Sequence, residues 1–288
     1  MTQQSGLYDR DRYYDSDGQA SRLAPSLNGL LYALDWAKAW STVRAYRRMN
    51  GGQTQGAPLR VLDIGAGDGK FLHFMRRFGF ETEGTTASAT SQQAAAEKFG
   101  IQLEHTTEIP ARIRELKFDL ITYWHVFEHL EDPAAHVSTW KEILAPSGLI
   151  VIEVPNVESI GAKLAFDAWL GSDVVHHVNH MKFDDIVALL RQHDLQIVRR
   201  EEFSLKFTYP FLWSALLGKA FGTQQYSFNS IFDTLKNPLG QMRAAPLATL
   251  NALASAAYLA PAVGVSAAAG MLLHRGEVLK LYVQSTSR

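Results

Sequence analysis

The segment from Val61 to Leu72, VLDIGAGDGKFL, constrains the fold of this chain more than any other. It begins with an apolar run typical of a buried parallel strand, and apolar residues return at helical spacing from Phe71. Between these elements lie Gly65, Gly67 and Gly69, which lack a Cβ and let a ligand lie against the backbone. The free N–H groups of the following helix favour an anionic group. The segment therefore predicts a ligand-binding turn at the carboxyl end of a strand.

Two familiar glycine-rich sites do not fit this turn. A phosphate-binding P-loop ends in Gly-Lys-Ser/Thr, whereas Phe71 follows Lys70 here. A dinucleotide site needs the spacing GxGxxG, and Lys70 stands where its last glycine would be. The turn is instead GxGxG with an acid, Asp63, two residues ahead of the first glycine. A glycine-rich turn without a ligand is the remaining alternative.

Composition excludes several other classes of protein. The chain of 288 residues carries 28 basic and 29 acidic residues, a balance that predicts no nucleic-acid partner. It has no cysteine, which excludes disulfides, thiol nucleophiles and cysteine-ligated metal centres. The polar first thirty residues lack the apolar core of a signal peptide, so we expect a cytoplasmic protein.

Strand-like and helix-like segments alternate after the glycine turn, as in a doubly wound α/β sheet. The expected strands include 80–86, 101–104, 149–154, 195–203 and 277–285, together with the start of FDLITYWHVFEHLEDP, residues 118–133. Asp132 and Pro133 are expected to begin a helix, as its N-cap and its first helical residue.

Three of these segments resemble a known family. Asp63 with its GxGxG turn resembles motif I of the class I S-adenosylmethionine (SAM) dependent methyltransferases, and the chain is similar to methyltransferase domain family 23. The segments FDLITYWHVFEHLEDP and LAPSGLIVIEVPN resemble the ubiquinone-biosynthesis O-methyltransferase type. The resemblance covers residues 59–203 and implies a seven-stranded Rossmann-like sheet in which one of the last two strands is antiparallel.

This resemblance also divides the chain. Residues 1–58 would form an N-terminal arm and a cap helix, residues 59–203 with 276–288 the SAM-binding catalytic domain, and residues 204–275 a helical insertion between the last two strands.

The family pattern assigns cofactor-binding roles along the carboxyl edge of the sheet. The residues implied are Asp63, Gly65, Ala66, Gly67, Gly69, Thr86, Thr106, Thr107, Trp124 and His125. Thr86 stands where the family usually has an acid that binds the cofactor ribose, so this site would lack that charge.

Two histidine-containing segments are candidates for chemistry on the methyl acceptor. His177 and His180, in a family-like H-x-x-H, are predicted acid–base residues, with His176 a weaker alternative to His177. Asn156 and His176 are expected to face the substrate.

His125, Glu128 and His129 would share one face of a helical turn. They could hold a divalent metal, as the related E-x-x-E-H segment does in the family. Alternatively, Glu128 and His129 fix the loop by hydrogen bonds and act in catalysis without a metal, while His125 covers the adenosine. We favour this second interpretation and expect no metal.

Two regions outside the sheet could contact a membrane. The segment 27–49, a basic helix bearing tryptophans, would either cap the cofactor site or lie on a membrane surface. Residues 244–273 contain no charged side chain, and Pro261 divides them into halves too short to cross a bilayer as helices. They would form a lid over the site or an element in the membrane interface.

The sequence therefore predicts a methyltransferase acting on a small molecule. The favoured acceptor is a hydroxyl of a hydrophobic or lipid-linked compound, reached by a cytoplasmic protein that is free or peripheral on the membrane. The alternatives are methylation of a soluble sugar or secondary metabolite, and a SAM-binding scaffold without catalysis.

Overall fold

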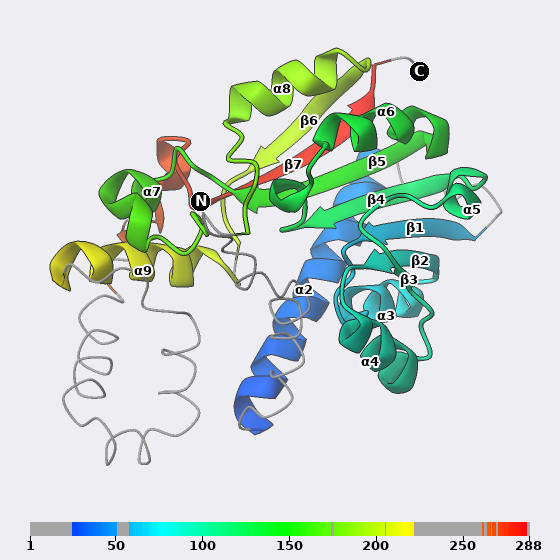
Figure 1. Cartoon of the computed structure of the whole chain (residues 1–288), viewed down its shortest axis with the longest axis horizontal. Helices are drawn as coiled ribbons and strands as arrows, with labels where there is room; N and C mark the ends of the chain where they lie inside the picture. Colours follow the sequence, from blue (N-terminus) through cyan, green and yellow to red (C-terminus); the bar gives the residue numbers. More distant parts are fainter. Residues whose placement is uncertain are drawn as a thin grey trace, which may run out of the picture.

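The computed structural model describes residues 25–50, 58–173, 176–204, 206–221, 261, 264–265, 267–268 and 270–286. Figure 1 shows a twisted central sheet with helices on both faces and a separate helical layer beside one edge. Most of the insertion between residues 204 and 275, including its uncharged centre, lies outside the described residues.

The sheet has seven strands in the order β3-β2-β1-β4-β5-β7-β6. The strands are β1 Leu59–Ile64, β2 Phe80–Thr86, β3 Glu104–His105, β4 Phe118–Trp124, β5 Leu144–Pro155, β6 Leu195–Glu201 and β7 Val278–Ser285. Only β7 runs antiparallel to its neighbours, β5 and β6. The predicted doubly wound methyltransferase sheet is confirmed. The third strand, expected at 101–104, is shorter and lies slightly later in the chain.

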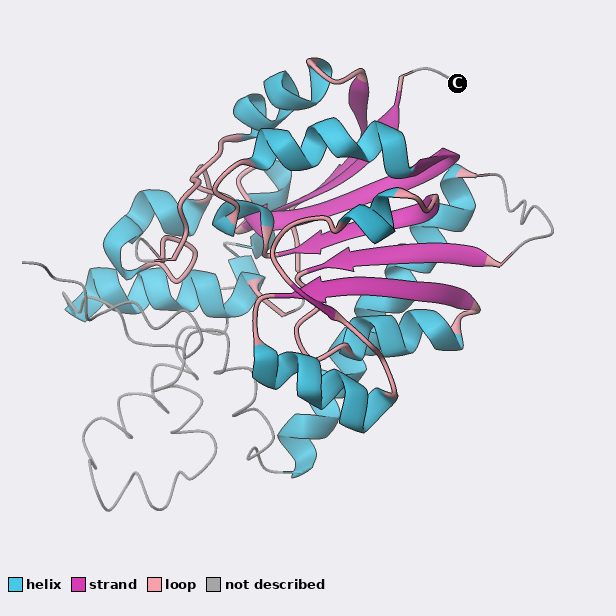
Figure 2. Ribbon diagram, turned by 45° about the vertical axis from the view of Figure 1, so that its right-hand side comes forward, coloured by secondary structure: helices cyan, strands magenta, loops and turns pink. Residues whose placement is uncertain are grey.

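Two layers of helix cover the sheet (Figure 2). The layer on one face comprises α2 Pro25–Met49, α3 Lys70–Arg77 and α4 Ala89–Phe99; the layer on the other comprises α5 Ala111–Arg114, α6 Pro133–Ile143 and α8 Phe183–Arg191. A third group, α7 Ile160–Ala165, the 3-10 helix η3 Phe166–Ala168 and α9 Thr208–Phe221, packs on itself beside the carboxyl edge. A short 3-10 helix, η2 Phe127–His129, follows β4.

Successive residues of the central strands pack alternately into the two hydrophobic cores, one on each face of the sheet. In β1, Val61 packs with α2 and α3, whereas Leu62 packs with α6. In β4, Leu120 and Ile121 divide in the same way. A strand covered on both faces is apolar at most positions, which is why Val61 and Leu62, and likewise Leu120 and Ile121, are neighbouring apolar residues in the sequence.

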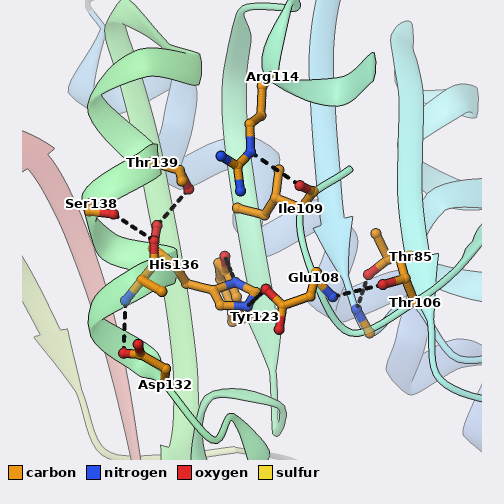
Figure 3. Close-up of polar contacts among 12 residues, drawn as sticks. Thr85, Thr106, Glu108, Ile109, Arg114, Tyr123, Asp132, His136, Ser138 and Thr139 are labelled. Atoms are coloured by element: carbon orange, nitrogen blue, oxygen red, sulfur yellow. Dashed lines mark hydrogen bonds and ion pairs between the residues drawn. The ribbon is translucent and has the colours of Figure 1, made fainter. Parts of the chain in front are cut away.

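The predicted start of α6 is also confirmed. Asp132 is the N-cap, its carboxylate accepts a hydrogen bond from the Ala135 N–H at 3.0 Å, and Pro133 is the first helical residue. Figure 3 shows this cap beside a buried polar contact that ties α6 to β4. There the Tyr123 hydroxyl lies 3.1 Å from His136 Nδ1 and accepts a hydrogen bond from Trp140 Nε1 at 2.9 Å.

Candidate active site

The glycine turn connects β1 to α3 at the carboxyl edge of the sheet. Gly65, Gly67 and Gly69 all have positive φ angles, of 71°, 53° and 76°, a conformation that residues with a Cβ rarely adopt. A Cβ on Gly65 would lie 2.3 Å from a methyl carbon of Val126. The Ala66 N–H donates to the Thr85 carbonyl oxygen at 2.7 Å, which fixes the turn against β2. The backbone therefore leaves a bare concave turn.

Beside the turn lie a buried acid and a cation from the N-terminal helix. The Asp63 side chain has a single hydrogen bond within the described part of the chain, from the Thr122 hydroxyl at 2.5 Å, and burial raises its pKa to about 7. The Lys38 ammonium, on α2, lies 4.7 Å from the ring centre of Trp124 and 5.1 Å from that of Phe71. Burial lowers the pKa of Lys38, and the carboxylates of Asp35 and, to a smaller extent, Asp63 partly oppose this. The indole N–H of Trp124 is buried and has no hydrogen-bond partner among the described residues.

A second charged group lies beyond β4 and β5. His125 has a φ of 54° and its ring contacts two buried carboxylates, Glu128 through Nδ1 and Glu153 through Nε2, each at 3.3 Å. Lys280 on β7 contacts the other oxygen of Glu153 at 3.0 Å. Phe207, just before α9, covers the His125 ring at a centroid distance of 3.8 Å. His125 is thus enclosed between the sheet and the first residues of the insertion.

The two carboxylates determine the charge of His125. Burial alone would lower the pKa of His125, but Glu128 and Glu153 outweigh it and raise the pKa. In turn, His125 lowers the pKa of Glu128 against the effect of burial, and Lys280 together with His125 lowers that of Glu153. The group is therefore a buried array of alternating charges.

A pH-dependent stability follows from this array. In the unfolded chain a histidine titrates near 6.5, so below that pH both states are protonated and the stabilisation by His125 is complete. As the pH rises through the higher folded pKa, the charge of His125 and its contribution are lost. We expect the difference in unfolding free energy between the wild type and H125Q to shrink as the pH rises above 6.5, measured by urea denaturation. A difference that stays constant across this range would contradict the ion pairing.

The histidine loop meets η2 on the other side of Glu128. The Asn179 N–H donates to the Glu128 carbonyl at 3.0 Å, and His129 Nδ1 donates to the His176 carbonyl at 3.0 Å. His177 Nδ1 donates to the Gly171 carbonyl at 3.0 Å, which directs Nε2 toward Glu128, 3.9 Å away. Burial lowers the pKa of His177 to about 4, so the ring is neutral at physiological pH.

His177 and Glu128 line a small cavity between β5, η2 and the histidine loop. The rest of its lining is largely apolar and includes Phe127, Val154, Met181 and Ile186. His180 also lines the cavity, although its Nε2 donates to the Ser172 carbonyl at 2.6 Å. The cavity therefore combines an apolar wall with one neutral imidazole and one carboxylate.

These features match a known family. A family model described as "Methyltransferase domain" matches residues 36–200, more than half of the chain. The chain belongs to this methyltransferase family. Two similar proteins, both named ubiquinone biosynthesis O-methyltransferase, come from Ruegeria sp. (strain TM1040) and Ruegeria pomeroyi. The first is 31% identical over 54% of this chain and 67% of its own length, and the second is 30% identical over 51% and 64%. The matches thus span about two thirds of these relatives or less.

A solved structure agrees on the fold. A protein named as a sarcosine dimethylglycine methyltransferase of Galdieria sulphuraria covers 97% of this chain and 98% of its own, with a TM-score of 0.56 and 13% identity. The family uses SAM as its methyl donor, and this protein is a SAM-dependent methyltransferase.

The charged and polar residues around the glycine turn suit the charged groups of SAM. SAM carries an ammonium, a carboxylate and a sulfonium. The buried Asp63 carboxylate lacks a cation in direct contact within the described residues, and Lys38 supplies a half-buried positive charge near it. The Trp124 N–H, which has no partner among the described residues, and the glycine turn complete a site that suits a zwitterionic ligand. The roles of the predicted turn residues remain predictions that this geometry supports.

Three threonines predicted to bind the cofactor lie at the end of β2 and just after β3. Thr86 is buried at the end of β2, and its hydroxyl accepts a hydrogen bond from the Ser88 N–H at 3.4 Å. The Thr106 hydroxyl accepts a hydrogen bond from the Glu108 N–H at 3.0 Å within its own loop (Figure 3). Thr107 is exposed. Nothing in these contacts tests their predicted roles toward ribose or adenine.

The two predicted substrate-facing residues are bound to the protein itself. Both ends of the buried Asn156 amide bind backbone groups: Nδ2 donates to the Gly276 carbonyl at 2.8 Å, and Oδ1 accepts from the Glu158 N–H at 3.0 Å. His176 Nδ1 lies 2.7 Å from the Asp173 carboxylate. The roles of Asn156 and His176 toward the substrate stay predictions.

The expectation that His125, Glu128 and His129 share a helical face is wrong. His125 precedes η2 and has a left-handed backbone conformation, so it does not belong to the helical turn that carries Glu128 and His129, although its Nδ1 lies 3.3 Å from Glu128. Ligand atoms of Glu128, His129 and His177, rather than of His125, lie within 4.8 Å of one another and could hold a metal. Lys38, Glu153 and Lys280 are the site residues that the sequence analysis missed.

Proposed function

We propose that this methyltransferase transfers the methyl group of SAM to a hydroxyl oxygen of a hydrophobic, lipid-linked small molecule. The observation that carries the proposal is His177, whose neutral Nε2 faces Glu128 in a cavity with apolar walls. The relatives named ubiquinone biosynthesis O-methyltransferase support the same type of acceptor. An acceptor of this kind would be reached from the cytoplasmic face of a membrane.

The chain's residues then have distinct tasks. SAM supplies an electrophilic methyl carbon on its sulfonium, which an oxygen attacks in line as the carbon–sulfur bond breaks. Holding the acceptor in that line provides much of the rate gain, and the apolar cavity wall would do so. The hydroxyl proton passes to His177 Nε2, and the Glu128 carboxylate at 3.9 Å stabilises the resulting imidazolium. The Gly171 carbonyl holds the imidazole in this orientation, and the Asn179 N–H ties the histidine loop to the backbone of Glu128.

The direct test is the product itself. The purified protein is incubated with SAM bearing a deuterated methyl group and a lipid extract, and the products are identified by mass spectrometry. We expect a labelled O-methyl ether in the lipid fraction, with and without a chelator. Labelling confined to water-soluble compounds would contradict the lipid-linked acceptor, and an absence of turnover despite SAM binding would favour a scaffold. Loss of activity with the chelator alone would assign a metal to Glu128, His129 and His177.

Lys38 is proposed to bind the carboxylate of SAM, and this can be tested with two ligands. We expect K38M to weaken SAM binding by about tenfold, since a charge-assisted hydrogen bond to an anion contributes about 1.5–3 kcal/mol. Methylthioadenosine lacks that carboxylate, so its affinity should change little. Isothermal calorimetry with both ligands measures the difference. Equal losses for the two ligands would show that Lys38 supports the fold of the site and not the carboxylate.

A further inference from the structure

The N-terminal helix α2 has an exposed face that the cofactor site does not use. Tyr32, Trp36 and Trp40 are 40%, 46% and 42% exposed, although side chains of this size are usually covered. They are spaced four residues apart and so lie on one side of the helix. Trp36 and Trp40 are stacked with ring centroids 6.3 Å apart.

The same face continues into a cationic half. Arg44, Arg47 and Arg48 are exposed, and the guanidinium of Arg44 lies 5.1 Å from the Trp40 ring centre. The acid of this helix, Asp35, is buried on the opposite side, 5% exposed. From Tyr32 to Arg48 the face is about 24 Å long, aromatic at one end and positively charged at the other. We call this surface, Tyr32, Trp36, Trp40, Arg44, Arg47 and Arg48, the aromatic–arginine face.

The opposite side of α2 packs against the rest of the protein. Ala39, Thr42, Val43 and Tyr46 are buried, and Lys38 points to the cofactor site. In Figure 1 the N-terminal half of α2 extends beyond the sheet. None of the described helices is long and apolar enough to cross a bilayer. A contact through this face would therefore lie along a surface.

We propose that the aromatic–arginine face of α2 docks the enzyme on an anionic lipid bilayer. Tryptophan and tyrosine rings favour the headgroup region, where an apolar ring and a polar N–H or O–H are both accommodated, and arginines are attracted to anionic headgroups. The occupant follows from charge complementarity, because this face carries three cations and no exposed acid. The inference rests on the proposed function, since it explains how a lipid-linked acceptor is reached.

Vesicle co-flotation with matched variants tests this surface. The full chain is mixed with vesicles of phosphatidylcholine containing roughly a third phosphatidylglycerol, and with neutral vesicles. We expect the wild type to float with the anionic vesicles only. R47Q/R48Q should weaken the binding on the order of 30-fold, because each arginine near such a surface contributes about fivefold. W36A/W40A should also weaken it. K182Q/R191Q, which removes the same charge from α8, should bind like the wild type.

Several outcomes would overturn the proposal. They are no flotation of the wild type, equal flotation with neutral vesicles, or α2 variants that float as well as K182Q/R191Q. Displacement of the protein from vesicles by equimolar polyglutamate would assign the face to an acidic protein partner instead. SAM affinity and turnover, measured without vesicles, separate this result from the proposed function. Variants that keep SAM affinity and turnover but no longer float would show that membrane docking is distinct from catalysis. A wild type that floats with vesicles but shows no turnover would refute the proposed methyl transfer and leave the docking proposal standing.

Discussion

Replacing Gly67 by valine should abolish SAM binding while the sheet still folds. Gly67 is the middle glycine of the turn and has a φ of 53°, so a branched side chain there would fill the space that the cofactor must occupy against the backbone. We expect calorimetry to show at least a hundredfold loss of affinity, which corresponds to about 2.7 kcal/mol. Unchanged SAM affinity in a folded G67V protein would show that the cofactor lies elsewhere.

A matched control separates this effect from backbone strain. Gly79 also has a positive φ, of 92°, and a Cβ there would meet no atom within 4 Å. It lies between α3 and β2, at the opposite edge of the sheet from the glycine turn. G79V should therefore lower the melting temperature about as much as G67V does and leave SAM affinity intact. A similar loss of affinity in both variants would indicate general destabilisation.

Replacing His177 by alanine should lower the turnover rate roughly 10²- to 10⁴-fold with SAM affinity unchanged, as expected for the loss of a general base. Only Nε2 of this histidine faces Glu128, since Nδ1 is held by the Gly171 carbonyl. Single-turnover kinetics with saturating SAM measure the chemical step directly.

His176 and His180 serve as neighbouring controls for this variant. His176 binds Asp173, and His180 donates its Nε2 proton to the Ser172 carbonyl. H176A should keep most of the activity, and H180A should lose less than H177A does. If H180A is the more impaired and H177A nearly normal, His180 is the base. An equal fall in rate and SAM affinity for H177A would instead point to collapse of the histidine loop.

The fold was predictable because each element carries its own signal. The glycine turn after β1, the Asp132 cap of α6 and the apolar runs of β4 and β5 are each local in the sequence. Their order along the chain is that of a known family, which supplied the position of the antiparallel strand. The expected third strand was misplaced because β3 has only two residues, too few for periodicity to show.

The charged centre of the site was not predictable in the same way. Glu153 and Lys280 are far apart in sequence, but they lie opposite each other in the register of β5 and β7. The signal was present in part, since each is the single charged residue of its strand. Without the strand pairing, nothing connected the two. Similarly, the pattern of the basic, tryptophan-bearing segment 27–49 did not show that Lys38 lies against the rings of Phe71 and Trp124, beside the glycine turn.

The position of β7 between β5 and β6 has a consequence for synthesis on the ribosome. Both neighbouring strands emerge well before β7, which follows the insertion in the chain. Until β7 arrives, each presents a strand edge with unpaired backbone groups, and the buried Glu153 lacks its lysine. The nascent chain therefore cannot close its sheet one element at a time. The two unpaired strand edges close together, when the final strand enters between them.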